Sequence, residues 1–266
     1  MSSVAFVRNL KTDVLPWLPK KQFHRITVPF QPVQGRMYSQ ALSGLLDELR
    51  ATDELSFRRS YTSYLARRAA LLQVCSNPRG IADGYTETPA KLIVLDALIE
   101  DAISRSEKVV VWSAYRASID AIVERYAHVG LVRYDGSLTG VDERREAVRS
   151  FQEEEGTRLF VGNPAAAGAG LTLHSARLSI YESISLQAAH YLQSIDRIHR
   201  RGQQRSVEYF VVLCDRSLEV SEYERLVAKE AAAHELLGDQ VEAPSTRETF
   251  IRELELAARL LSAGTA

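Results

Sequence analysis

Apolar residues recur along the chain with two different periods, and the change of period divides it into regions. From Met37 to Leu49, and again from Phe57 to Val74, they return every three or four positions, which is the spacing of one helix face. Both stretches are therefore predicted to be helices. The first 35 residues hold four prolines, which disfavour a long helix, and residues 24–28 alternate like a short strand.

Beyond residue 84, short apolar runs alternate with helical stretches. The turn-rich segment 76–84 marks the boundary. The predicted strands are 108–112, 131–134, 158–161, 178–181 and 207–213, and the predicted helices between them are 117–126, 142–151 and 187–200. This alternation is typical of an α/β fold, in which a parallel sheet carries helices on both faces.

The chain is predicted to have three parts. Residues 1–87 form a lead-in and helical segment, residues 88–216 form the α/β unit, and residues 217–266 form an acidic helical tail that is interrupted near Pro244. A length of 266 residues is enough for one sizeable core with a smaller appendage.

Charge is distributed unevenly, although the net charge is −1. Residues 1–88 hold 12 Lys and Arg against 7 Asp and Glu, whereas residues 218–266 hold 5 against 10. The basic segment is compatible with phosphate contacts and equally with solvated helix faces. Because the whole chain is nearly neutral, any nucleic-acid surface must be local.

Composition excludes several classes of protein. The two cysteines, Cys75 and Cys214, lie far apart in the sequence, which predicts a reducing interior without a disulfide framework. His174 and His190 lack partners at metal spacing, so no zinc site is predicted. Neither an apolar signal-peptide core nor an apolar run of about 20 residues occurs. We expect a cytoplasmic protein that does not bind membranes, and association with the nucleoid is left open.

Two arginines one helical turn apart carry the most informative chemistry. Residues 193–203 read Gln-Ser-Ile-Asp-Arg-Ile-His-Arg-Arg-Gly-Gln. On the predicted helix, Arg197 and Arg200 would project from one face, a spacing that suits a polyphosphate. Gln193 and Asp196 would hold the helix or its arginines, and His199 is expected to pack or to form a hydrogen bond. Taken alone, an arginine-rich helix is most often a solvated surface.

A loop of small residues, 162–176, follows the predicted strand 158–161. Two of its glycines, Gly168 and Gly170, would let the backbone approach a ligand closely. Their spacing differs from that of the dinucleotide fingerprint. A tight strand–helix connection explains such a loop as well.

The order of these segments resembles the C-terminal lobe of the Snf-type (sucrose-non-fermenting) ATPases, the chromatin-remodeller-like branch of helicase superfamily 2. The last motif of that family, Q-x-x-D-R-x-H-R-x-G-Q, agrees with residues 193–203 at every specified position. The family's A-G-G-x-G-x-N-L loop is similar to residues 166–173, with Ala167 for Gly and Thr172 for Asn. Residues 110–113, 134–137 and 7–20 are also similar, so the resemblance covers roughly residues 7–230.

The resemblance implies a RecA-like lobe in which Arg197 and Arg200 act as arginine fingers on ATP with Mg²⁺, across a cleft between two lobes. It places Gly168, Gly170, Gln193 and Asp196 near the nucleotide. It places Ser113, Tyr115 and Asn163 against the backbone of nucleic acid, for which double-stranded DNA is expected. The family usually has a hydroxyl pair where this chain has Gly162-Asn163. Glu182, at the end of a predicted strand, could face the same cleft.

The sequence contains neither a G-x-x-x-x-G-K-[ST] phosphate loop nor an Asp-Glu pair after a strand to hold Mg²⁺. The isolated chain is therefore expected not to hydrolyse ATP, and a first ATPase lobe would come from a partner or from a longer protein. One alternative is a non-catalytic module that binds nucleic acid or protein with the same fold. An unrelated doubly wound enzyme would require an accidental match at residues 193–203.

Overall fold

The computed structural model describes residues 17–167, 170–185, 187–235 and 246–263. Within them, six strands form a single sheet in the order β1-β6-β5-β2-β4-β3, and every neighbouring pair is parallel. The strands are β1 (Lys21–Val28), β2 (Val109–Trp112), β3 (Leu131–Tyr134), β4 (Leu159–Gly162), β5 (Leu178–Tyr181) and β6 (Val207–Cys214). The short run near the N-terminus thus becomes the edge strand β1, paired with β6 along its full length.

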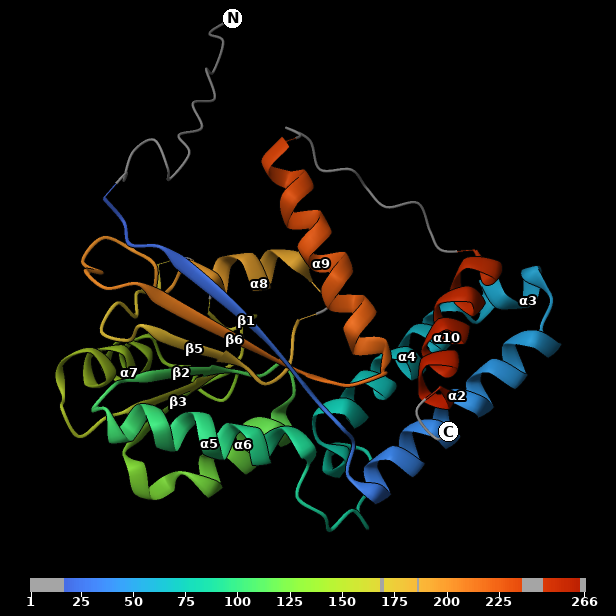
Figure 1. Cartoon of the computed structure of the whole chain (residues 1–266), viewed down its shortest axis with the longest axis horizontal. Helices are drawn as coiled ribbons and strands as arrows, with labels where there is room; N and C mark the ends of the chain where they lie inside the picture. The colour runs from blue at the N-terminus through green and yellow to red at the C-terminus, as the bar shows by residue number, and fades with distance from the viewer. Residues whose placement is uncertain (1–16, 168–169, 186, 236–245, 264–266) are drawn as a thin grey trace, which may run out of the picture.

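Helices cover both faces of this sheet, which confirms the predicted fold class (Figure 1). They are α2 (Pro32–Ala51), α3 (Glu54–Arg59), α4 (Tyr61–Ser76), α5 (Ala90–Ser104), α6 (Arg116–Arg125), α7 (Val141–Glu153), α8 (Ala188–Ile195), α9 (Leu218–Glu235) and α10 (Arg247–Ser262), with 3-10 turns at Pro78–Gly80 and Ala127–Val129. No described helix combines the length and apolar character that a membrane crossing requires.

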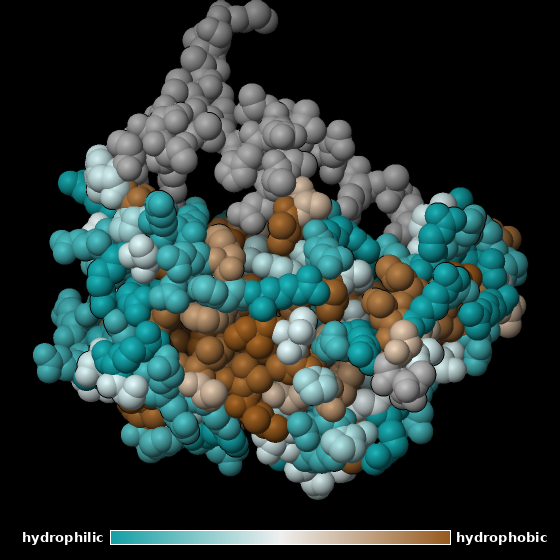
Figure 2. Space-filling view, in the orientation of Figure 1, coloured by the Kyte–Doolittle hydropathy of each residue, from teal (hydrophilic) through white to brown (hydrophobic). Residues whose placement is uncertain are grey.

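Alternation along the strands produces two cores. Val109 and Val111 pack in one core with α5 and α6, whereas Val110 and Trp112 pack in the other with α7 and α8. Successive side chains of a strand point to opposite faces, so β2 contributes to both cores. Helices α2, α4 and α10 add their apolar faces to the first core. Figure 2 shows an apolar area between β1 and α5, where Leu98, Ala102 and Phe210 line a groove.

Two predicted helices differ from the structure, and one helix was not predicted. The helix predicted over 57–74 is two helices, because Asp53 caps a short α3 and the chain turns at Ser60 before α4. Helix α5 was not predicted, since its apolar residues run almost all round it and hide the helical period. The helix predicted over 187–200 ends at Ile195. This last difference moves both candidate arginines off a helix.

The uneven charge is balanced by ion pairs between the two ends of the chain. Arg25 pairs with Glu224, Arg50 with Glu255, and Arg68 with both Glu222 and Glu253. In addition, α10 packs against α2, with Phe250 and Leu254 buried in the core (Figure 1). These basic side chains therefore pair with the acidic tail. The sequence had suggested phosphate contacts or solvated helix faces for the basic segment, and did not indicate this pairing. The division into three domains stays a prediction.

Candidate functional site

Arg197 and Arg200 lie in a turn that follows α8, because Asp196 ends that helix. The turn is fastened to the small-residue loop. The amide of Leu173 donates to the carbonyl of Arg197 at 2.8 Å, and Gln203 Nε2 donates to the carbonyl of Ala176 at 2.9 Å. These bonds replace the helical bonds that the sequence pattern predicted, and they hold the arginines against the loop.

Both guanidinium groups contact the small-residue loop, a contact that the sequence analysis did not predict. Arg197 is 3% exposed and donates to the carbonyls of Ala167, at 2.8 Å, and Leu171, at 3.4 Å. Arg200 is half-buried and donates from NH1 to Thr172 Oγ1 at 3.1 Å. Gly170 adopts φ +98°, and Gly168 lies outside the described residues.

The main chemical feature of this site is the positive charge of the buried Arg197 guanidinium. The acceptors of its guanidinium are carbonyl oxygens, which carry no net charge, and in the described part of the chain its Nε has no acceptor. Burial and the neighbouring Arg200 lower its pKa from the ordinary value, although a guanidinium remains charged. The carboxylate of Asp196 acts on this charge in the opposite direction but does not outweigh burial and Arg200. Two adjacent cations, of which Arg197 donates to neutral carbonyls, make a site that favours an anion with several charges, such as a polyphosphate.

The other polar residues of the motif fasten the turn to its surroundings. The carboxylate of Asp196 lies 3.4 Å from Lys21 Nζ on β1, and its carbonyl accepts from Arg200 Nε at 3.2 Å. His199 is buried, and its Nε2 donates to the carbonyl of Pro19 at 2.8 Å. Gln193 is exposed on α8. Asp196 thus contacts Arg200 through its backbone, and whether it or Gln193 binds nucleotide stays a prediction.

Gly202 closes the turn with a conformation that favours glycine. Its φ is +106°, and a Cβ there would lie 3.0 Å from Cδ2 of His174. We expect Gly202→Ala to lower the free energy of unfolding by about 1–2 kcal/mol, measured by urea denaturation, because a side chain is strained at this φ. Gly84→Ala is the control, since no atom lies within 4 Å of its Cβ position. Equal stability of the two variants would contradict this account.

The three candidate nucleic-acid residues meet at the carboxyl edge of the sheet, after β2 and β4. Ser113 is fully buried and donates to Glu182 Oε2 at 2.7 Å. Asn163 Nδ2 donates to the carbonyl of Ala114 at 3.2 Å. These groups hold the edge loops, so their contact with nucleic acid stays a prediction. One exposed cation at this edge is Arg116, with a side chain 81% exposed, which only its position at a helix start could have indicated.

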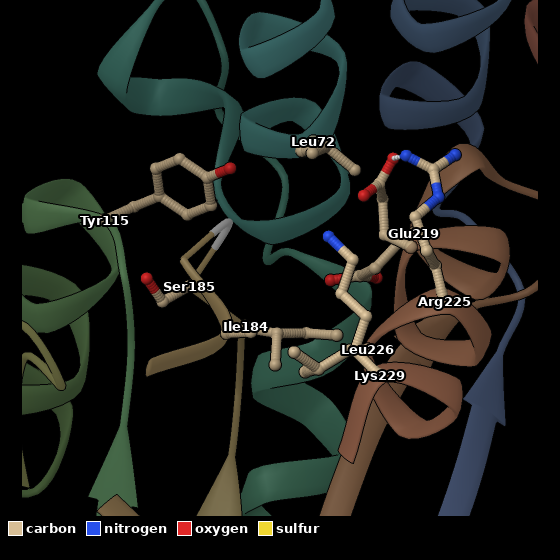
Figure 3. Close-up of a pocket in the computed structure, with 10 residues that line it drawn as sticks. Leu72, Tyr115, Ile184, Ser185, Glu219, Arg225, Leu226 and Lys229 are labelled. Atoms are coloured by element: carbon tan, nitrogen blue, oxygen red, sulfur yellow. Dashed lines mark ion pairs between the residues drawn. The ribbon is translucent and has the colours of Figure 1, made fainter. Parts of the chain in front are cut away.

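Tyr115 turns towards a pocket between α4, α9 and the loop after β5 (Figure 3). Leu72, Ile184 and Leu226 form its apolar lining, with the charged side chain of Lys229 at one side. The cavity has a volume of about 40 Å³, which holds a water molecule but no nucleotide. Burial raises the pKa of Tyr115 above its ordinary value, so the hydroxyl stays protonated.

A buried ion pair lies beneath this edge, and the sequence pattern did not reveal it. Lys91 is fully buried, pairs with Glu219 and donates to the carbonyl of Glu182 at 2.7 Å. Burial alone would lower the pKa of Lys91, but Glu219 and Glu182 outweigh it and raise the pKa above the ordinary value. Glu182 is 1% exposed, so the expectation that it faces a cleft is wrong. Its carboxylate is directed inward because two serine hydroxyls donate to it.

One described group has metal-ligand chemistry but does not fit a metal ion. Ligand atoms of Cys75, Cys214 and Glu219 lie within 4.8 Å of one another. However, the ammonium group of Lys91 already pairs with Glu219. Burial also raises the pKa of Cys214, which favours the thiol over the thiolate that metals bind. The cluster is therefore interpreted as part of the buried core.

Asp135 fixes the turn after β3 at the same edge of the sheet. Its Oδ1 accepts from the amide of Ser137 at 2.9 Å, and its Oδ2 accepts from Arg133 Nε at 2.9 Å. Burial alone would raise the pKa of this carboxyl group. The hydrogen bonds from Arg133 and Ser137 outweigh burial and lower the pKa to about 2.

The lowered pKa of Asp135 predicts a pH-dependent contribution to stability. The contribution is fully present above the unfolded pKa of about 3.9 and is lost as the pH falls through the folded pKa. We expect Asp135→Asn to cost about 1–2 kcal/mol at pH 6 after allowance for solvent screening. The difference in free energy of unfolding between the wild type and Asp135→Asn, measured by urea denaturation, should decrease as the pH is lowered from 4 to 2. A gap that is constant with pH would contradict the assignment.

Comparison with known proteins identifies the α/β unit. Residues 90–202 match the family model of the helicase conserved C-terminal domain. A Homo sapiens SWI/SNF-related matrix-associated actin-dependent regulator of chromatin, subfamily A member 1, is 26% identical over 238 residues, which are 84% of this chain and 22% of the relative. The chain therefore spans about a fifth of the length of such relatives. The resemblance that the motifs indicated is confirmed.

Solved structures agree with the fold. The C-terminal domain of a Sulfolobus solfataricus SWI2/SNF2 ATPase aligns with a TM-score of 0.67 at 18% identity, covering 91% of this chain and 99% of that one. The core of the Sulfolobus solfataricus SWI2/SNF2 ATPase in complex with dsDNA aligns with a TM-score of 0.68 at 19% identity, covering 91% of this chain and 49% of that one. The predicted RecA-like sheet is thus confirmed.

Proposed function

We propose that this chain, which contains the helicase conserved C-terminal domain found in Snf-type ATPases, is the second motor lobe of an ATP-dependent DNA translocase. In this proposal it supplies Arg197 and Arg200 to ATP that a first lobe holds. One observation carries it: two adjacent guanidinium groups lie against the small-residue loop, and the more buried one has only neutral acceptors. A polyphosphate would supply the missing negative charge.

The two arginines would contribute differently. Carbonyls of Ala167 and Leu171 fix Arg197, so its charge is pre-organised and needs no reorientation. Arg200 is held by the hydroxyl of Thr172 and the carbonyl of Asp196, and it is less buried, so it can move to a phosphate. Charge that develops on the transferring phosphoryl group would be stabilised by both. The first lobe, in a partner or in the same polypeptide, would hold ATP with Mg²⁺, since this sequence has no phosphate loop.

Double-stranded DNA is the proposed track, and the carboxyl edge of the sheet is its proposed site. The solved Sulfolobus solfataricus core that shares this fold was determined in complex with dsDNA. At the carboxyl edge of the sheet in this chain, the loops that contain Ser113 and Asn163 lie beside the exposed Arg116. Side chains and helix starts of this kind contact phosphate oxygens without reading sequence. We propose that the protein acts in the cytoplasm on such DNA.

The test is an ATPase assay of the chain mixed with a matching first lobe, with and without duplex DNA. Hydrolysis that requires both lobes and rises with DNA is expected, whereas the chain alone should be inactive. DNA binding without any hydrolysis in the mixture would instead favour a non-catalytic binding module.

A further inference from the structure

The buried carboxylate of Glu182 joins three elements that meet at the carboxyl edge of the sheet. Its Oε1 accepts from Ser76 Oγ at 2.6 Å, at the end of α4. Its Oε2 accepts from Ser113 Oγ at 2.7 Å, in the loop between β2 and α6. Glu182 itself begins the loop after β5, and its carbonyl accepts from Lys91 on α5. One side chain therefore fixes the end of the helical segment relative to two edge loops.

A carboxylate is the group that suits this position. An ionised carboxylate is costly to bury unless hydrogen bonds satisfy its oxygens. Here each oxygen accepts from a different serine, and Lys91 supplies positive charge nearby. Glutamine would keep one accepting oxygen but would place an amide donor where the other oxygen lies. The charge and both acceptors are thus used, although the group is hidden from solvent.

Two backbone amides of the loop that Glu182 holds donate to serine hydroxyls, one in the loop after β5 and one in the loop itself. The amide of Ala114 donates to Ser183 Oγ at 2.9 Å, and the amide of Tyr115 donates to Ser113 Oγ at 3.2 Å. Helix α6 begins at Arg116 immediately after this loop. The loop therefore sets the direction in which Arg116 leaves the surface, with Asp120 as an acidic neighbour at 4.0 Å.

We propose that Glu182 is a positioning residue for nucleic-acid binding. Its carboxylate fixes residues 113–116 and thereby directs Arg116 and the first turn of α6 at a phosphate of duplex DNA. This inference rests on the proposed function and adds to it the residue that sets the geometry of the DNA-binding edge. Glu182 itself is buried and does not touch DNA.

The test measures binding of the chain to a short fluorescent DNA duplex, by anisotropy, over a series of salt concentrations. We expect Glu182→Ala to weaken binding about tenfold and to reduce the salt slope by about one phosphate contact. The affinity and the salt slope of Glu182→Gln should lie between those of Glu182→Ala and the wild type. A loss of folded protein would lower the bound fraction without changing that slope, so the slope separates positioning from stability.

Glu107→Gln is the matched control. Glu107 is also a buried carboxylate, but it accepts from Arg177 and Arg205 at the opposite end of the sheet, just before β2. Its substitution should lower the melting temperature and leave the affinity and the salt slope at wild-type values. An equal loss of affinity in this control would overturn the assignment to Glu182.

The two proposals fail in different ways. If the wild-type chain binds duplex DNA and Glu182→Ala binds it with unchanged affinity and slope, Glu182 does not position the loop. If the wild-type chain shows no salt-dependent binding at all, the DNA part of the proposed function falls with it. If Glu182→Ala does not fold, hydrogen exchange of the Glu182→Gln variant tests whether Glu182 positions the loop. Faster exchange confined to amides 113–117 is expected, and unchanged exchange there overturns the inference.

Discussion

Replacing Arg200 with alanine is expected to reduce ATP turnover of the assembled two-lobed motor by about 10³-fold or more. The guanidinium group lies at the turn after α8, half-buried and held by one hydroxyl and one carbonyl. Removing it deletes charge that stabilises the transferring phosphoryl group and leaves most of the turn in place, because Leu173 and Gln203 fasten that turn independently. Steady-state ATPase assays with saturating duplex DNA measure the effect.

Arg201→Ala is the control for this variant. Arg201 is adjacent in sequence and carries the same charge, but its side chain is exposed, whereas that of Arg200 is half-buried. Turnover should fall in the Arg200 variant with little change in the KM for ATP or in DNA affinity, and the Arg201 variant should resemble the wild type. Full turnover with alanine at position 200 would remove Arg200 from the reaction, and equal losses in both variants would indicate a general charge effect.

The order of elements and the motor motifs could be predicted from the sequence because both are local patterns. The strands lie in short apolar runs bounded by polar residues, and residues 193–203 form one continuous motif. The contact between Arg200 and Thr172 of the small-residue loop, by contrast, is shown only by the structure. The nucleotide and DNA roles of these residues stay predictions.

The features that the sequence did not indicate depend on contacts between distant segments. Helix α8 stops at Ile195, and in the turn that follows the amide of Leu173 donates to the carbonyl of Arg197, a bond that helical periodicity cannot foresee. The sequence gives the basic first third and the acidic tail as two separate segments. Ion pairs between them in the structure show that they lie together. Lys91 occurs in an apolar run, and its partner Glu219 is 128 positions away. Such pairings require the tertiary fold.

Lys91→Met is expected to destabilise the chain by about 3–5 kcal/mol, the largest loss of stability among these variants. The substitution keeps the length and apolar stem of the side chain but leaves Glu219 buried without its cation. The carbonyl of Glu182 also loses its donor. Burial already raises the pKa of Glu219 even with Lys91 present, so an uncompensated carboxylate there is strongly disfavoured. Urea denaturation at neutral pH measures the change.

Two further variants separate the buried charge from the lost hydrogen bonds. Lys108→Met removes a lysine that donates to the carbonyls of Phe151 and Glu154 without a buried carboxylate partner, so about 1 kcal/mol should be lost. Combining Lys91→Met with Glu219→Gln should restore more than half of the stability that Lys91→Met loses, because glutamine removes the charge and still accepts from the amide of Cys214. A double variant no more stable than Lys91→Met would show that packing around the ammonium group, and not the unpaired carboxylate, causes the loss.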